Sequence, residues 1–144
     1  MARYDLGFRT LDGTVAAPAA EIRSTSSDKP RILEITMLQT AAAASALNIG
    51  IGRPAALGVG PISPVKMLPE EVADPAASVL IATQWGTKPT IPTAFYRRIG
   101  AATGVGNGLI VAFPRGLTIA VSSSIVLWNI LANSLMDVSV SIGE

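Results

Sequence analysis

The chain has 144 residues, of which 49% are hydrophobic and only 15% charged, and its formal net charge is +1. It has no cysteine and no histidine, which excludes disulfides, thiolate metal sites, conventional zinc sites, Ser-His-Asp triads and Cys-His dyads. Charged residues usually make up about 25% of a soluble domain. A chain with so few of them either enters a membrane or buries extra surface against partner chains.

The longest apolar stretches are interrupted, which argues against the membrane. A spanning helix needs about 20 apolar residues in a row. The stretch from residue 41 is broken by Asn48 and Arg53, and the stretch from residue 124 is broken by Asn129 and Asn133. The opening MARYDLGFRT is charged where a signal peptide would be apolar. We therefore expect no membrane partner and burial against other protein chains.

Alternation of apolar and polar residues is the dominant pattern, and turn residues recur about every 8 to 12 positions. The pattern predicts a single all-β domain, an antiparallel sandwich of eight or nine strands resembling a jelly roll. Residues 1–18 allow an extended N-terminal arm. The expected strands cover residues 19–26, 31–40, 46–52, 78–85, 94–101, 108–113, 117–122, 124–130 and 135–143.

Residues 53–77 form a long, irregular and apolar segment with five prolines. A loop of this length in a compact domain is usually functional or docked on a neighbour, and proline lowers the entropy lost on docking. We expect this segment, together with residues 87–92, to contact neighbouring chains. Arginine is enriched at interfaces, so the expected interface residues are Arg53, Leu57, Val59, Ile62, Met67, Leu68, Pro89, Ile91, Arg97 and Arg115.

The stretch FPRGLTIAVSSSIVLWN, residues 113–129, places three serines between two apolar runs. A serine nucleophile needs a general base, and the sequence has no histidine to serve. We interpret FPRG as a strand end and turn, and Ser122–Ser124 as the turn between two strands.

Two further groups fit ligand sites poorly. The glycines of residues 104–108 match neither of the phosphate-loop spacings G-x-G-x-x-G and G-x-x-x-x-G-K-[ST]. The Asn-Gly pair in this segment predicts a hairpin turn. Glu70, Glu71 and Asp74 lie too close in sequence to face each other across a glycosidase cleft, and they lack the spacing of a calcium loop. We interpret them as a solvated turn or a salt-bridging contact with a partner. The sequence predicts no enzyme, no catalytic residue, no cofactor and no metal.

The aromatic and basic residues leave one alternative open. Trp85, Tyr96 and Trp128 are the side chains best suited to bind sugars or to anchor an interface. Arg97 and Arg98 would point to opposite faces of a strand, and the other basic residues are scattered. Nucleic-acid binders usually gather Lys and Arg on one face, so we expect no nucleic-acid partner.

The chain resembles the small β-sandwich structural proteins of tailed bacteriophage virions, in particular capsid decoration or cement proteins, and less closely head-fibre and tail-tip components. The similarity lies in the opening MARYDLGFRT, the all-β layout, the Ala/Gly/Ser/Thr-rich strands and the segment AFPRGLTIAVSSSIVLWN. It implies a non-enzymatic virion protein, assembled in the host cytoplasm, that binds the major capsid protein and itself. Such surfaces favour a symmetric oligomer, with a trimer preferred. The alternative is a carbohydrate- or receptor-binding module of a head fibre or tail.

Overall fold

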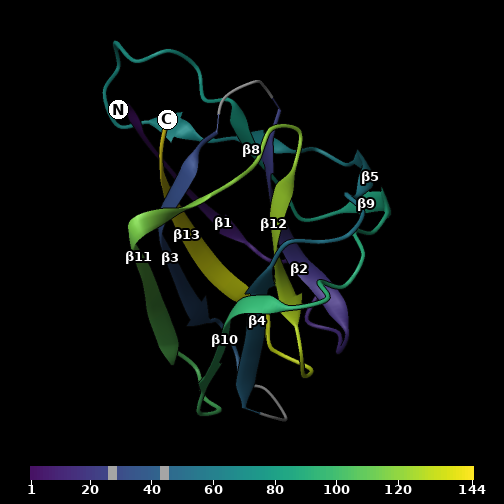
Figure 1. Cartoon of the computed structure of the whole chain (residues 1–144). Coiled ribbons are helices and arrows are strands. Elements are labelled where there is room, and N and C mark those ends of the chain that lie inside the picture. The colour runs from purple at the N-terminus through teal and green to yellow at the C-terminus, as the bar shows by residue number, and fades with distance from the viewer. Residues whose placement is uncertain (26–28, 43–45) are drawn as a thin grey trace.

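The computed structural model describes residues 1–25, 29–42 and 46–144, which form an all-β sandwich (Figure 1). These residues contain 13 strands and no helix. One layer, sheet A, has five strands in the order β11 (Gly108–Thr118), β3 (Arg31–Gln39), β13 (Met136–Gly143), β1 (Arg3–Arg9) and β7 (Leu68–Pro69). The other, sheet B, has six in the order β10 (Phe95–Ala101), β4 (Leu47–Gly52), β12 (Ser124–Asn129), β2 (Ala17–Ser24), β8 (Val79–Ala82) and β6 (Val65–Lys66). A separate ribbon pairs β5 (Val59–Pro61) with β9 (Trp85–Thr87).

Every strand pairing is antiparallel, which confirms the predicted fold class. The long strands pair in a nested way: β1 with β13, β2 with β12, β3 with β11 and β4 with β10. Successive pairs fall alternately in sheet A and sheet B. The nested pairs thus build the two layers of an antiparallel sandwich.

Alternation along the strands places one apolar face of each sheet in a shared core. In β13 the side chains of Met136, Val138, Val140 and Ile142 are buried, while Asp137 faces outward. The largest fully buried side chains come from strands of both sheets and from two residues, Met67 and Ile119, that lie beside strand ends. They are Tyr4, Ile22, Ile32, Ile35, Met37, Leu47, Ile49, Ile51, Met67, Ile119, Ile125 and Leu127. Burial of these aliphatic side chains is the main source of stability.

The outer face of sheet B is also covered, because Gly50 and Gly52 leave room for other parts of the chain. A Cβ at Gly50 would overlap the ring of Phe95, and a Cβ at Gly52 would overlap Pro92 and the carbonyl of Ala94. All six residues of β12, which pairs with β4, are also buried. Only glycine permits this close approach.

The structure differs from the predicted arm over residues 1–18. Residues 3–9 form β1, which lies inside sheet A between β13 and β7. Tyr4 and Leu6 alternate with Arg3 and Asp5, so one face of the segment enters the core and the strand is held on both sides.

Two predicted turns also differ from the structure. Residues 113–116 are a wide bulge within the continuous strand β11, since the register jumps from Ala112 opposite Glu34 to Leu117 opposite Ile32. Residues 102–107 are not a hairpin turn, because β10 and β11 belong to different sheets. The prediction for Ser122 is confirmed, as it lies in a turn with a φ of +48°, whereas Ser124 begins β12.

Candidate functional site

The connection from β4 to β10, residues 53–94, carries the segment expected at an interface. It contains β5 to β9, so the region predicted as irregular holds three very short strands before β8. In Figure 1 β5 and β9 stand beside β2 at the right of the sandwich. We call residues 53–94 the insertion.

A buried carboxylate fastens the insertion to sheet B. Glu21 of β2 has no exposed surface and accepts hydrogen bonds from Trp85 Nε1 at 2.8 Å, Ser124 Oγ at 2.7 Å and the Gly58 amide at 3.3 Å. The Arg23 guanidinium lies 3.7 Å from the same carboxylate and donates to the Gly58 carbonyl at 2.8 Å. Glu21 is thus satisfied by neighbours on every side, and Ser124 is inaccessible as a nucleophile.

The insertion keeps its apolar side chains outward although its backbone is held in place. The Ile62 amide donates to the Gln84 carbonyl at 2.9 Å, and the Glu70 amide donates to the Arg3 carbonyl at 2.9 Å. More than half of each of these side chains is nevertheless exposed: Val59, Ile62, Val65, Leu68, Val72 and Ile91. An ordered segment that exposes this many apolar side chains is typical of a binding surface.

One part of the insertion closes the side of the sandwich. Residues 65–69 pair with β8 of sheet B through β6 and then with β1 of sheet A through β7. Met67 lies between these two pairings and enters the core with 2% of its surface exposed. We call residues 65–69 the strap, and the side of the sandwich that they cover the closed edge.

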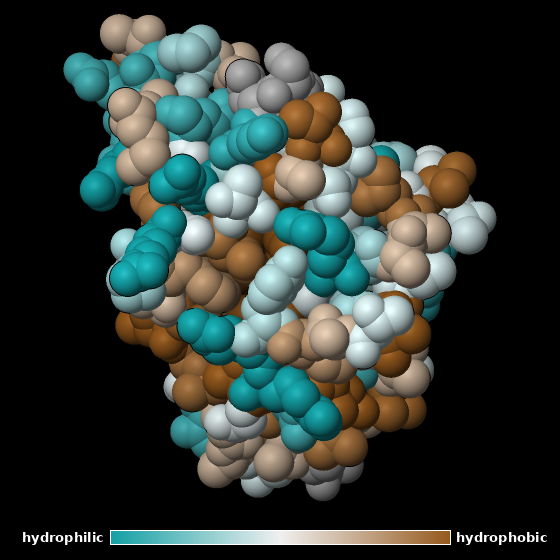
Figure 2. Space-filling view, in the orientation of Figure 1, coloured by the Kyte–Doolittle hydropathy of each residue, from teal (hydrophilic) through white to brown (hydrophobic). Residues whose placement is uncertain are grey.

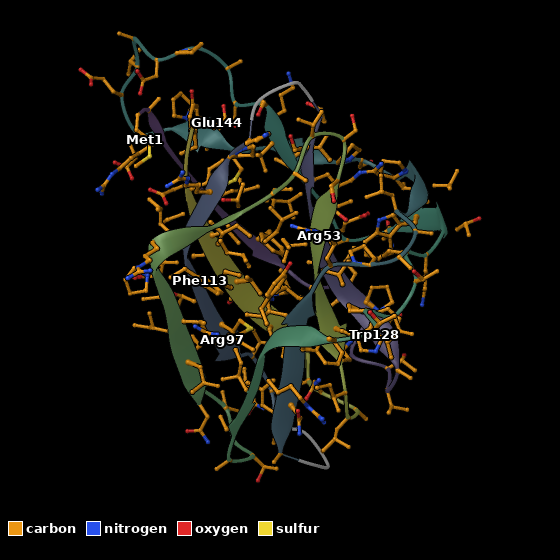
Figure 3. All side chains as sticks on the ribbon, in the orientation of Figure 1. Met1, Arg53, Arg97, Phe113, Trp128 and Glu144 are labelled. Atoms are coloured by element: carbon orange, nitrogen blue, oxygen red, sulfur yellow. The ribbon has the colours of Figure 1, made fainter. Side chains whose placement is uncertain are left out.

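The opposite side, formed by β10 and β11, has no such cover among the described residues, and we call it the open edge. Arg97 stands opposite Ile51 of the core, so it lies on the core-facing side of sheet B, but at the edge of the sandwich, where it stays exposed. Its guanidinium is 5.7 Å from the centre of the Phe113 ring, and the two lie close together in Figure 3. A groove of about 350 Å³ opens here, lined by Tyr96, Arg97 and residues 113–117.

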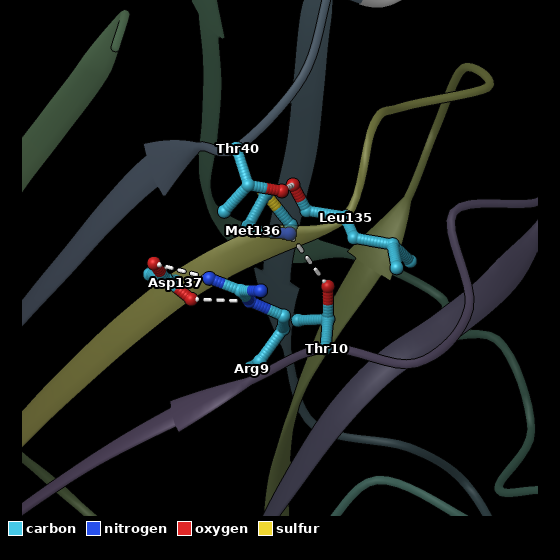
Figure 4. Close-up of polar contacts among 6 residues, drawn as sticks. All are labelled: Arg9, Thr10, Thr40, Leu135, Met136 and Asp137. Atoms are coloured by element: carbon cyan, nitrogen blue, oxygen red, sulfur yellow. Dashed lines mark hydrogen bonds and ion pairs between the residues drawn. The ribbon is translucent and has the colours of Figure 1, made fainter. Parts of the chain in front are cut away.

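The arginines at the open edge differ from the paired cations elsewhere. Arg9 binds both carboxylate oxygens of Asp137 at 2.7 and 3.0 Å, beside the Thr10 and Thr40 hydrogen bonds that tie the ends of β1 and β3 to β13 (Figure 4). Lys88 binds Asp12 at 2.7 Å. No described carboxylate forms an ion pair with any of the exposed arginines of the open edge, which are Arg53, Arg97, Arg98 and Arg115.

Two of these arginines lie over aromatic rings. Arg53 lies 6.0 Å from the centre of the Tyr96 ring, so both aromatic residues of the groove face a guanidinium. Figure 2 shows teal side chains around a brown area on this side of the molecule. Guanidinium groups that rest on aromatic rings are only partly hydrated, which prepares them to bind carboxylates.

The acidic residues that follow the strap form an exposed loop. The Asp74 amide donates to the Glu71 carbonyl at 3.0 Å, and Val72 between them is 98% exposed. A hydrogen bond shared with Asp5 raises the pKa of Glu70; slight burial and the negative charge of Asp5 also raise it, while Arg3 lowers it. The described residues hold no group of three or more acidic side chains placed to bind a metal ion.

The ten residues predicted at an interface separate into three groups. Met67 and Pro89 are buried within the chain, so we correct the prediction and leave them out of the interface; Met67 is buried because the strap carries it into the core. Leu57 is half-buried. The remaining seven are exposed: Val59, Ile62, Leu68 and Ile91 on the insertion, Arg53 where it begins, and Arg97 and Arg115 at the open edge.

The three candidate aromatic residues do not converge. Trp85 and Trp128 are buried, and the indole N–H of Trp85 is committed to Glu21. Tyr96 is 41% exposed and lines the open-edge groove. The sequence did not identify Phe113 or Glu21 as residues of a site. The one available signal concerned Glu21, an acidic residue inside the expected apolar strand 19–26.

Comparison of the chain with family models, with curated protein sequences and with solved structures finds no match. Over the ranges that the structure describes, no helix is long and apolar enough to cross a membrane.

Proposed function

We propose that this chain is a non-enzymatic structural protein of a virion, similar in role to capsid decoration or cement proteins, which binds copies of itself and the shell protein beneath it. The observation that carries the proposal is the insertion, because its backbone is fixed to both sheets while its apolar side chains point outward. A surface already held in its binding conformation loses little entropy on association.

The overall architecture supports the same role. Double-sheet folds with nested antiparallel strands recur in viral capsid and lectin domains, and the strand order here is consistent with one of them. The low charged fraction of 15% suits a chain whose surface is largely covered in an assembly.

Light scattering over a range of protein concentrations tests the assembly part of the proposal. We expect a closed oligomer, and the double variant Val59→Ser, Ile62→Ser should weaken it at least tenfold, roughly the effect of losing two apolar anchors. The matched control is Val105→Ser, Leu131→Ser, which removes exposed apolar side chains outside the insertion. Equal weakening by both pairs would contradict a specific role for the insertion.

Hydrogen exchange tests the attachment to a shell. The amides of residues 59–72 should exchange more slowly in virus particles that carry the protein than in the isolated chain. Equal exchange in both states would remove this segment from the interface.

A carbohydrate- or receptor-binding module remains the second candidate, and the groove beside Tyr96 is the observation that favours it. Stacking on sugars requires an exposed aromatic face, which the two buried tryptophans do not offer. A glycan array separates the candidates: specific binding that Tyr96→Ala abolishes would favour this second function.

A further inference from the structure

We propose that the acidic loop of one copy, residues 70–74, docks into the arginine-lined groove at the open edge of a second copy. The inference rests on the proposed function, since it names the contact by which copies of the chain join. It commits to a second copy because this chain itself carries both complementary surfaces.

The groove presents an apolar floor beneath positive charge. Phe113 is 7% exposed and lies under the guanidinium of Arg97, and Arg115 belongs to the bulge that forms one wall. The strands on both sides, β10 and β11, each pair with a neighbour on one side only. The groove therefore offers an apolar pocket, guanidinium donors and unpaired backbone groups to an incoming segment.

The loop has the matching shape and charge. Pro69 and Pro75 bound it, the Glu70 amide is held by the Arg3 carbonyl, and the Tyr4 hydroxyl donates to the Pro75 carbonyl at 3.1 Å. Between these fixed ends the loop turns outward, and Figure 1 shows it standing away from the sandwich at the upper left. Its tip is the exposed Val72, flanked by the carboxylates of Glu70, Glu71 and Asp74.

Within one chain the two surfaces do not fill each other. The loop begins next to β7, and the groove lies beside β11 at the other end of sheet A. Glu70 borders the same hollow over sheet A as Phe113 and Pro114, but no residue of the loop lines the groove itself. Val72 is 98% exposed, and the described ion pairs include none between this loop and the open edge. The contact between copies joins two different surfaces, so it is heterologous and closes into a ring when the rotation allows.

The electrostatics of each surface also improve on docking. Arg97 and Arg115 of the groove gain carboxylate partners, and the like charges of Asp5 and Glu70 gain a cation in addition to Arg3. Complementary charges of this kind mainly set the choice and the orientation of a partner.

Charge reversal with exchange of partners tests the proposal. The loop variant is Glu71→Lys, Asp74→Lys, and the groove variant is Arg97→Glu, Arg115→Glu. Each alone should weaken self-association at least tenfold at low salt, about what removal of close charge pairs produces. An equimolar mixture of the two variants should associate, as should one chain that carries all four changes, since opposite charges then face each other again.

Two controls separate a loss of the contact from an effect of net charge and from unfolding. Lys29→Glu makes the same change in net charge as the single variant Arg115→Glu, at an exposed site outside both the groove and the insertion, and should leave association unchanged. Because Arg97 covers Phe113, the single variant Arg115→Glu replaces the groove variant if thermal melting shows that the double variant is unfolded.

The outcomes separate this inference from the proposed function. Failure of both the mixture and the fourfold variant to associate would overturn the inference. If association is lost in Val59→Ser, Ile62→Ser but not in the reversed-charge variants, assembly through the insertion stands and the loop-and-groove contact falls. A wild-type chain that stays monomeric at every concentration would also overturn the inference, while protection of residues 59–72 on particles would still support shell binding.

Discussion

The closed edge and the open edge of this sandwich face the same physical problem, because each must shield the side of one hydrophobic core. At the closed edge the chain crosses from sheet B to sheet A, and Met67 of the strap enters the gap. At the open edge no described segment crosses along the side of the sheets, and Arg97 lies over the ring of Phe113.

The two edges differ in whether the group that covers the core can move away without unfolding the protein. The strap is part of both sheets, so it leaves only when strand pairing breaks. An arginine side chain keeps its charged end in water and can move aside for a partner. The comparison indicates that the closed edge contributes stability and that the open edge is available for binding.

The largest effect is expected from Glu21, which fastens the insertion that supplies the strap. Glu21→Ala removes the acceptor for Trp85, Ser124 and Gly58 and leaves Arg23 without its carboxylate. Loss of one partner from a buried charged cluster costs about 3–5 kcal/mol, and we expect that loss in urea unfolding. A loss below about 1 kcal/mol, as for an exposed site such as Glu34→Ala, would show that Glu21 is not the fastening point.

The strap itself provides the next test. Met67→Ala should lower the free energy of unfolding by about 2–5 kcal/mol, as is usual for a buried methionine. Its neighbour Leu68 is exposed, so Leu68→Ala should change it by less than about 0.5 kcal/mol. Equal effects in chemical denaturation would contradict the burial of Met67 and with it the closed edge.

The open edge should respond more weakly. Arg97→Ala uncovers Phe113 and removes a cation–π contact worth about 0.5–1 kcal/mol at an exposed site. Binding of a hydrophobic dye should increase, because the aromatic ring becomes accessible. The control Arg98→Ala, which stands opposite Gly50 on the outer face, should increase neither dye binding nor the loss of stability.

The smallest effect concerns pH at the closed edge. The hydrogen bond with Asp5 raises the pKa of Glu70, so its contribution is present below its unfolded pKa, near 4.5, and is lost as the pH rises through the folded value. Glu70→Gln keeps a donor at every pH, so calorimetry should show a melting temperature above that of the wild type at pH 7 and equal to it at low pH.

The opposite sign is expected for Asp137, whose pKa is lowered by the hydrogen bond from Arg9. Its contribution is present above the unfolded pKa, near 3.8, and is lost as the pH falls through the lower folded value. Asp137→Asn should therefore lower the melting temperature at pH 7, and the difference from the wild type should shrink as the pH falls through the folded pKa of Asp137. The same dependence for both variants would contradict the charge arrangement of sheet A.

The sequence predicts the fold class well because alternation directly reports strands with one buried face. The expected strand 135–143 coincides with β13 within one residue at its start, and its alternation is reproduced in the burial of its side chains. Local patterns do not report strand partners, which is why the Asn-Gly pair at 107–108 was assigned to a hairpin that the sheets do not contain.

The candidate site was predicted less completely, for two physical reasons. A two-residue strand has no measurable period, so the buried Met67 could not be told from its exposed neighbours Val65 and Leu68. Pro114 and Gly116 favour a turn and a bulge alike, and only the partner strand β3 decides between them. The exposed residues of the insertion were expected on composition alone, because apolar character and proline content are visible without tertiary structure.

The nested pairing has a consequence for how this protein reaches its native state. Arg3 lies opposite Gly143, and of the two described partners of strand β1, β13 is the long one and β7 has two residues. A ribosome therefore releases β1 long before its partner exists, and chains dominated by such distant pairings fold in milliseconds to seconds rather than microseconds, to an order of magnitude. During that interval the edges of the early strands are unprotected, and a neighbouring nascent chain can pair with them.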